Sequence, residues 1–260
     1  MKYGFIGCGN MGGAIAKALA KTTTDFLLTD RSGKGAELAA HLGAGYADAQ
    51  TVAGCPRVFL GVKPYLMEQV LAPLQPIFAE RKPLLITMAA GLSMQQIEEF
   101  AGCRLPVIRI MPNTPVAVGK GLIPYCCNDL VTKEQLDSFV KDMAFAGTLD
   151  ALEEGLMDAV SALSGSGPAY VYMFLEAMAD GAVACGIPRA KALNYAAATV
   201  IGAAETMLAT GQHPGALKDA VCSPKGSTIV GVRTLEEHGF RGAVMDCIEA
   251  TYRKNLDMGK

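Results

Sequence analysis

Glycines near the N-terminus have a type and spacing suited to phosphate binding. The run GCGNMG follows the apolar residues Tyr3–Ile6 and precedes a helix-favouring stretch. In this context the first glycine makes a tight turn, the second lets the backbone approach a pyrophosphate, and the third lets the helix pack closely on the strand. The N-terminus of that helix attracts the negative charge. We therefore predict dinucleotide contacts, rather than an ordinary glycine turn, at Gly7, Cys8, Gly9, Asn10, Met11 and Gly12.

A carboxylate, Asp30, ends the second predicted strand. A carboxylate at this place binds the ribose hydroxyls of NAD. Arg31, Ser32 and Lys34 follow directly, and such side chains could instead bind the 2′-phosphate of NADP. A third interpretation is that Asp30 only caps the next turn. These residues leave the choice of cofactor open, and Asp30, Arg31 and Ser32 are candidate contacts.

Two further strand ends carry residues suited to the same crevice, because ligands of open parallel sheets bind beyond the carboxyl ends of the strands. Small residues after one strand would let a flat nicotinamide approach the backbone, and a lysine after another could contact phosphate or ribose, or simply be solvated. The loop Met111–Pro115 ends a further strand and is either a contact or a structural turn. The predicted contacts at the first two ends are Val62, Lys63, Pro64, Ala89 and Ala90.

The second half of the chain contains two glycine- and serine-rich segments, each before a predicted helix. Free backbone N–H groups and hydroxyls at such places can hold a carboxylate, so the pair predicts a small anionic substrate; simple helix capping is the alternative. His213 could donate a proton, but a structural role at a helix N-terminus is the favoured interpretation. The candidate substrate contacts are Ser164, Gly165, Ser166, Gly167, Pro168, Gly226, Ser227 and Thr228.

The elements that must position these residues follow from hydrophobic periodicity. Short apolar runs alternate with helical stretches through the first half, which predicts a parallel sheet covered on both faces. The predicted strands are Tyr3–Ile6, Phe26–Thr29, Val58–Val62, Leu84–Met88, Val107–Met111 and Leu122–Tyr125. After about residue 155 only helices are expected. We predict an α/β domain over residues 1–154 and an all-α domain over 155–260.

One predicted helix is apolar around most of its circumference. The segment Ala192–Ala204, ALNYAAATVIGAA, has almost no polar face, whereas a surface helix would show one. The few helices of this half can barely enclose it. We therefore favour a subunit interface over the alternative, a central helix of a single-chain bundle, and expect a homodimer.

Composition excludes several classes of function. The formal charge is −2 and the pI is about 6.0, so no basic face for nucleic acid is expected. The N-terminus does not resemble a signal peptide, and no apolar stretch is long enough to span a bilayer, so we expect a soluble cytoplasmic protein. The eight cysteines show no metal-ligand spacing, and we interpret them as reduced thiols with no metal site.

Several motifs in order resemble one family closely. GFIGCGNMG, VKP, MAAG, RIMPNTP, SGSGPAYVYMFLEAMADG, HPGALKD and SPKGSTI are together similar to pyrroline-5-carboxylate reductase over nearly the whole chain. The resemblance implies a Rossmann-like domain followed by a helical dimerisation and substrate domain. It implies hydride transfer from NADPH, or NADH, to a cyclic imine, giving L-proline in the last step of its biosynthesis. It further implies a homodimer that can assemble into a decamer.

The resemblance also implies roles for individual residues. Thr228 and its neighbours would bind the substrate carboxylate close to the imine, and we take Thr228 as the catalytic candidate, orienting the imine nitrogen. The segment Ser164–Pro168 would line the same pocket. Family members usually carry glycine where this chain has Lys225. If that position needs a positive φ, lysine costs about 1 kcal/mol there; its charge could instead lie near the anionic substrate.

Two other functions are alternatives. A β-hydroxyacid dehydrogenase shares the N-terminal motif but needs a lysine at the position of Val171, so it would lack its acid–base group. A non-catalytic dinucleotide sensor would leave both substrate-like segments unexplained. The reductase is the favoured prediction.

Overall fold

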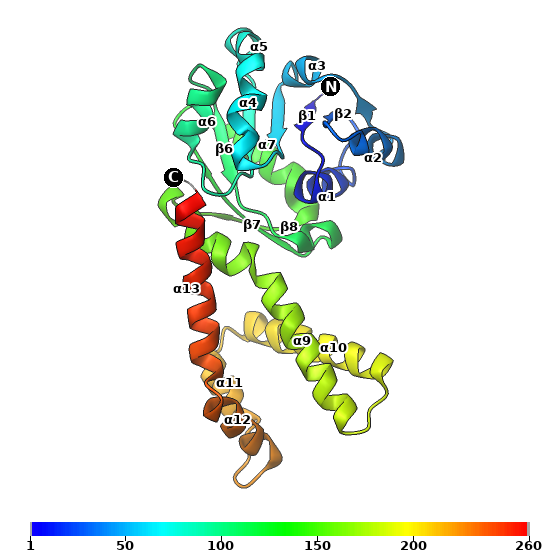
Figure 1. Cartoon of the computed structure of the whole chain (residues 1–260), viewed down its shortest axis with the longest axis vertical. Helices are drawn as coiled ribbons and strands as arrows, with labels where there is room; N and C mark the ends of the chain where they lie inside the picture. The colour runs from blue at the N-terminus through cyan, green and yellow to red at the C-terminus, as the bar shows by residue number, and fades with distance from the viewer. Residues whose placement is uncertain (1, 259–260) are drawn as a thin grey trace. The chain divides into compact units, whose positions relative to one another are not determined.

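A computed structural model describes residues 2–258 and divides them into two compact units (Figure 1). The first unit contains the residues up to Ser166 together with those from Thr251 onward, and the second is Gly167–Ala250. The outer limits of the two predicted domains, at 1 and 260, lie outside the described residues. The placement of the domain boundary at 154/155 stays a prediction.

The first unit is built on one eight-stranded sheet in the order β3-β2-β1-β4-β5-β6-β7-β8. Pairing is parallel throughout except between β6 and β7, which are antiparallel. The order 3-2-1-4-5-6 is that of dinucleotide-binding sheets, in which the strand order reverses between β1 and β4. The strands are β1 (Tyr3–Ile6), β2 (Phe26–Thr29), β3 (Gly45–Tyr46), β4 (Arg57–Leu60), β5 (Leu84–Thr87), β6 (Val107–Ile110), β7 (Gly121–Cys127) and β8 (Gly147–Ala151).

Helices connect these strands and continue through the second unit. Those of the first unit are α1 (Asn10–Leu19), α2 (Lys34–Leu42), α3 (Ala49–Ala53), η1 (Pro64–Leu66), α4 (Met67–Leu71), η2 (Ala72–Leu74), α5 (Gln75–Arg81), α6 (Met94–Ala101), η3 (Thr114–Val118), α7 (Lys133–Met143), η4 (Ala144–Ala146), η5 (Glu154–Leu156), α8 (Met157–Val160) and the π-helix η6 (Ser161–Gly165). The later helices are α9 (Gly167–Ala184), α10 (Arg189–Thr210), α11 (Pro214–Ala220), α12 (Ser227–Glu237) and α13 (Phe240–Met258). None of these helices combines the length and apolar character needed to cross a membrane.

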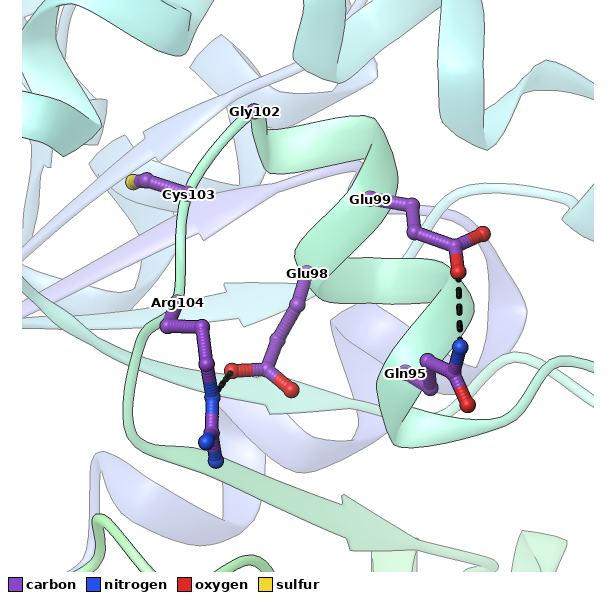
Figure 2. A pocket seen from close by; sticks show the side chains of 6 residues that line it. All are labelled: Gln95, Glu98, Glu99, Gly102, Cys103 and Arg104. Carbon is purple, nitrogen blue, oxygen red and sulfur yellow. Dashed lines mark hydrogen bonds and ion pairs between the residues drawn. The ribbon is translucent and has the colours of Figure 1, made fainter.

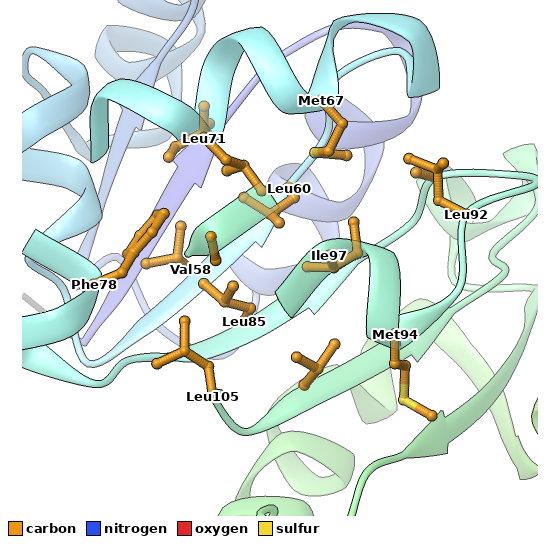
Figure 3. Packing of buried hydrophobic residues seen from close by; sticks show 14 of the residues in the cluster. Val58, Leu60, Met67, Leu71, Phe78, Leu85, Leu92, Met94, Ile97 and Leu105 are labelled. Atoms are coloured by element: carbon orange, nitrogen blue, oxygen red, sulfur yellow. The ribbon is translucent and has the colours of Figure 1, made fainter. Parts of the chain in front are cut away.

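Alternation along the strands creates two apolar clusters, one on each face of the sheet. Val58 and Leu60 of β4 join a cluster with α3, α4, α5 and α6, whereas Phe59 between them joins a cluster with α1, α2 and α7. Figure 3 shows the first of these clusters, with buried side chains contributed by the sheet and by α4, α5 and α6. Because a strand exposes alternate residues to opposite faces, near-continuous apolar strands fit a sheet that is covered by helices on both faces. The predicted α/β fold with a parallel-dominated sheet is confirmed.

A buried carboxylate ties together the amino-terminal ends of the central strands. Asp142 of α7 accepts hydrogen bonds from Lys2 Nζ (2.6 Å), from Arg57 Nη1 (3.3 Å) and from the hydroxyl of Tyr3. Tyr3 begins β1 and Arg57 begins β4. We call Lys2, Tyr3, Arg57 and Asp142 the amino-edge cluster; it fixes α7 against the sheet at the edge opposite the glycine turn.

The second unit is helical and buries little of its own apolar surface. The helices α9 and α10 pack against each other, yet the buried hydrophobic residues of this unit are only the alanines at 179, 192 and 196. Large apolar side chains stay exposed along every helix from α9 to α13 except the short α11. Examples are Tyr172, Met173, Tyr195, Ile201, Leu208, Val230, Leu235 and Met245.

The structure departs from the predicted elements in three ways. Two strands, β3 and β8, and two helices, α3 and α5, were not predicted; the strands are short or largely exposed and carry weak patterns. The sequence leaves Ser164–Gly167 as a non-helical segment before a helix, whereas Ser164 and Gly165 belong to the π-helix η6 and Gly167 begins α9. Its serines and glycines suggested a turn because they favour turns locally.

Candidate active site

The glycine turn after β1 is packed backbone against backbone. Gly7 has φ of +96°, and a Cβ there would meet the carbonyl of Gly61 at 2.7 Å. A Cβ on Gly12 would lie 2.2 Å from the carbonyl oxygen of Gly7, and one on Gly61 would lie 2.4 Å from the same oxygen. These three glycines therefore allow α1 and the end of β4 to approach the turn. Gly61 was not among the predicted residues, because it lies inside the predicted strand Val58–Val62, whereas β4 ends at Leu60.

The head of α1 is open. Gly9 is its N-cap and is exposed, no side chain caps the helix, and a Cβ on Gly9 would meet nothing within 4 Å. Free N–H groups at the start of a ten-residue helix are the donors that a pyrophosphate needs. The first turn, from Asn10 to Gly12, thus has no side-chain cap that would occupy its N–H groups.

Cys8, within the same motif, faces inward. Its side chain is 7% exposed, and its Sγ donates to the carbonyl of Thr29 at 3.6 Å. Burial, with a smaller effect of the Asp30 charge, raises the pKa of this thiol to about 12. The thiol therefore stays protonated at neutral pH and packs in the core, so any cofactor contact of Cys8 is made by its backbone.

At the end of β2, both oxygens of the Asp30 carboxylate are engaged. Oδ1 accepts from the Gly35 N–H (2.9 Å) and Oδ2 from the Ser32 hydroxyl (2.5 Å). Partial burial acts to raise the pKa of Asp30, but the hydrogen bonds from Ser32 and Gly35 outweigh it and hold the pKa below its usual range. Arg31 and Lys34 are exposed beside it. The third interpretation, a carboxylate that organises the turn into α2, matches these contacts.

The ends of β4 and β5 lie next to the glycine turn because β1, β4 and β5 are neighbours in the sheet. Val62 Cγ1 lies 3.0 Å from the position of a Cβ on Gly7, so Val62 packs against the turn. Lys63 is exposed and precedes Pro64, the first residue of η1. After β5, Ala89 is buried and Ala90 is partly exposed. The sheet therefore brings the predicted residues 62–64 and 89–90 to the same edge as Gly7–Gly12.

The loop after β6 has a structural role. The Asn113 side chain is 9% exposed, and its Oδ1 accepts from the Leu122 N–H at 3.0 Å, which fixes the start of β7. Thr114, next along the chain, is exposed.

The segment Ser164–Pro168 satisfies its own polar groups. The Ser164 hydroxyl donates to the Val160 carbonyl (2.9 Å), and the Ser166 N–H donates to the Ser161 carbonyl (3.0 Å). The predicted carboxylate site rested on free N–H groups. Fewer of these groups are therefore free in this segment. A single-turn π-helix is rare and is often found at functional sites.

The head of α12 in the second unit is open, unlike the start of α9. Gly226 is its N-cap in an extended conformation without a side-chain cap, and Ser227 and Thr228 are exposed. Lys225 before it has φ of +61°, so the position does require the left-handed region. A helix of eleven residues with uncapped N–H groups and a hydroxyl in its first turn can hold a carboxylate.

His213 is the N-cap of α11. Its Nδ1 accepts from the Gly215 N–H at 3.0 Å, which favours the structural interpretation of this residue.

An open pocket on α6 contains none of the candidate residues. It is lined by Gln95, Glu98, Glu99, Gly102, Cys103 and Arg104 (Figure 2). Arg104 pairs with Glu98 at 3.2 Å, and Gln95 bonds to Glu99 at 2.9 Å. Its polar groups are largely paired with one another, so this pocket does not have the character of a reaction site.

Comparison with known proteins decides the family. The chain is 41% identical to pyrroline-5-carboxylate reductase of Escherichia coli (strain K12), over 100% of this chain and 98% of the relative. The chain belongs to the pyrroline-5-carboxylate reductase family. Residues 154–258 also match the family model for pyrroline-5-carboxylate reductase dimerisation, and residues 2–91 match that for NADP oxidoreductase coenzyme F420-dependent.

Solved structures of the pyrroline-5-carboxylate reductase family agree. A Plasmodium falciparum pyrroline carboxylate reductase with NADP bound has a TM-score of 0.91 and 32% identity, covering 100% of this chain and 98% of that one. The Streptococcus pyogenes 1-pyrroline-5-carboxylate reductase has a TM-score of 0.91 and 36% identity, covering 99% and 98%. The predicted family and its oxidoreductase class are confirmed, and the β-hydroxyacid dehydrogenase and sensor alternatives are not favoured.

Proposed function

We propose that this chain reduces 1-pyrroline-5-carboxylate to L-proline with NADPH. The observation that carries the proposal is full-length identity of 41% to a pyrroline-5-carboxylate reductase, together with an open glycine turn at the head of α1. This reaction would be the last step of proline biosynthesis.

The cofactor residues we propose lie in the first unit. The N–H groups of Gly9 to Gly12 would hold the pyrophosphate, with residues 62–64 and 89–90 near ribose and nicotinamide. When bound there, NADPH would supply the hydride. NADPH is favoured over NADH because the Asp30 carboxylate already accepts two hydrogen bonds, while Arg31 and Lys34 are exposed and positively charged. The NADP in the Plasmodium falciparum relative supports the same choice.

The substrate residues we propose are centred on the head of α12. The N–H groups of Ser227 and Thr228 would bind the carboxylate, and Gly226 allows the close approach. Residues 164–168 are proposed to line the pocket through the atoms that are not already hydrogen-bonded within the helix. Fixing the ring in one orientation contributes to rate by proximity.

Thr228 is proposed to orient the imine nitrogen by a hydrogen bond. The reacting species is the protonated imine, so a hydride added at carbon neutralises the charge and leaves a secondary amine, without need for a strong acid. A neutral hydroxyl is a weak acid, which is why orientation is assigned to Thr228 rather than proton transfer.

The test follows NADPH oxidation with 1-pyrroline-5-carboxylate and identifies proline as the product. Thr228→Ala is expected to lower kcat/KM by about 10- to 100-fold. The matched control is Thr234→Ala on the same helix, whose hydroxyl donates to the Val230 carbonyl at 3.1 Å; it should stay within about twofold. Absence of NADPH oxidation by the unmodified protein would reject the function, and equal rates for both variants would reject the role of Thr228.

We also propose a homodimer formed through the second unit, with a decamer as the higher assembly, and a cytoplasmic location. The match of residues 154–258 to a dimerisation family supports the first. Eight thiols without a disulfide fit a reducing compartment. No nucleic acid or membrane partner is proposed, in keeping with a net charge of −2.

A further inference from the structure

A buried arginine in the sheet is paired with two carboxylates from one connecting segment. Arg109 of β6 is 3% exposed. Its Nη1 lies 3.4 Å from Glu154 Oε1, and its Nη2 lies 3.1 Å from Asp158 Oδ1. Both carboxylates are mostly covered, at 33% and 23% exposure. We call Arg109, Glu154 and Asp158 the Arg109 clamp.

One side of the clamp holds the loop after β5. Glu154 Oε1, which faces Arg109, also accepts from the backbone N–H of Met94 at 2.6 Å. Met94 begins α6 and directly follows the loop that contains Ala89 and Ala90. A single carboxylate oxygen therefore connects Arg109 to the first residue of α6, which follows the loop proposed to lie near the nicotinamide.

The other side holds the segment that leads to the π-helix. Asp158 lies in α8, and α8 continues directly into η6, which carries Ser164. The main-chain carbonyl of Asp158 accepts from Asn255 Nδ2 at 3.1 Å, and Asn255 is 9% exposed. The clamp thus fixes the direction in which the chain enters the segment proposed to line the substrate pocket.

Stability alone does not account for this arginine. Its Nε is buried without a hydrogen-bond partner, Val107 and Met111 on the same face of the sheet are apolar, and Thr87 is its partner on β5. Buried ion pairs can often be replaced by apolar residues of similar volume without loss of stability, because desolvation offsets their attraction. A buried guanidinium with one unpaired N–H therefore adds little to packing. Its planar array of donors can nevertheless hold two carboxylates in a fixed geometry.

We propose that Arg109 is a positioning residue. It fixes the position of the Ala89–Ala90 loop relative to the π-helix η6. This inference rests on the proposed function. In this role Arg109 acts through Glu154 and Asp158 rather than by direct contact with a reactant. Because small displacements of reacting groups strongly reduce rate, loosening the clamp should lower kcat. The hydrogen bonds of the clamp join β6, α6 and the segment from Glu154 to Asp158 rather than the turn Gly7–Gly12, so affinity for NADPH should change little.

The experiment measures kcat, KM for 1-pyrroline-5-carboxylate, NADPH affinity and Tm for Arg109→Met and Arg109→Lys. For Arg109→Met we expect kcat to fall about 10- to 100-fold, with NADPH affinity within about threefold, and partial recovery in Arg109→Lys. Assays are run well below Tm, so that only folded enzyme is compared.

The matched control is Asp142→Asn in the amino-edge cluster, a buried charge network of similar size on the far edge of the sheet. It should lower Tm and leave kcat within about twofold. If Arg109→Met behaved like Asp142→Asn, the clamp would be purely structural and the inference would be wrong.

Glu154→Gln keeps the test decisive if Arg109→Met does not fold. This variant retains an acceptor for the Met94 N–H and removes only the charge facing Arg109. We expect a fall in kcat of about 3- to 10-fold. Unchanged kcat in both Glu154→Gln and Arg109→Lys would overturn the proposal. An inactive unmodified enzyme would instead reject the proposed function, so the two failures are distinguishable.

Discussion

The two units differ in where their apolar side chains lie. The largest fully buried side chains, such as Phe5, Phe59 and Phe139, all belong to the first unit. The second unit buries only alanines among its apolar residues and leaves large side chains such as Ile201 and Met245 exposed. Because burial of apolar area stabilises by roughly 25 cal/mol per Å², the first unit has a core of its own and the second depends on being covered. A second copy of the chain is the cover that we propose.

The largest expected effect would come from placing a charge on the uncovered helices. Ile201→Asp on α10 should weaken self-association at least about 100-fold, since an unpaired charge would be buried against the partner. Phe145→Asp in the first unit is the matched control, because Phe145 and Ile201 are each 57% exposed; it should leave the assembly intact. Sedimentation gives the mass of each variant. Equal masses for the two variants would contradict the proposed difference between the two units.

A second prediction concerns the stability of the first unit alone. Asp142→Asn should lower its free energy of unfolding by about 2 kcal/mol, because Lys2 and Arg57 lose their shared carboxylate. Thermal unfolding measures this, and the assembly should persist until the first unit melts. Asp129→Asn, which loses only an exposed pair with Arg104, should change Tm little.

The same carboxylate gives this contribution a pH dependence. Burial acts to raise the pKa of Asp142, but hydrogen bonds from Lys2 and Tyr3 and the charge of Arg57 outweigh it, and the folded pKa lies below the usual value near 3.8. Its stabilisation is therefore present above pH 4 or so and is lost as the pH falls through the folded pKa. Asp142→Asn should flatten the acid limb of the stability curve; an acid limb as steep as that of the unmodified protein would contradict this.

The smallest effect compares one turn in each unit. Lys82 (φ +48°) and Lys225 (φ +61°) both occupy the left-handed region without being glycine. Lys82→Gly and Lys225→Gly should each stabilise by about 0.5 kcal/mol, since relief of strain exceeds the added entropy of the unfolded chain. Denaturant unfolding can resolve such a change. A loss of stability in Lys225→Gly alone would indicate that this side chain makes a contact that holds the turn.

Much of the fold was predictable because its signals are local. Apolar strands separated by helices predicted the sheet, and the motif Gly7–Gly12 predicted the turn that the structure places at the head of α1. The short strand β3 carries too few residues for a period to emerge. The segment Ser164–Pro168 has turn-forming residues, yet Ser164 and Gly165 lie in η6 and α9 begins at Gly167.

The candidate site likewise contains residues that the sequence predicts and residues that it does not. Residues that directly follow strands could be found from the sequence, because topology alone brings strand ends together. The Arg109 clamp could not, since it joins β6, α6, η5 and α8 through contacts between residues far apart in the chain. Its one local signal was a charged residue within the otherwise apolar run Val107–Ile110.

The discontinuity of the first unit has a consequence for synthesis on the ribosome. Residues from Thr251 onward belong with Ser166 and its predecessors, although the whole of Gly167–Ala250 lies between them in the chain. The hydrogen bond from Asn255 to Asp158 can form only after that intervening segment has been translated. The sheet can assemble early in translation, whereas the segment beside α8 stays incomplete until the helical insertion has emerged, which makes maturation of the enzyme a late event in its biogenesis.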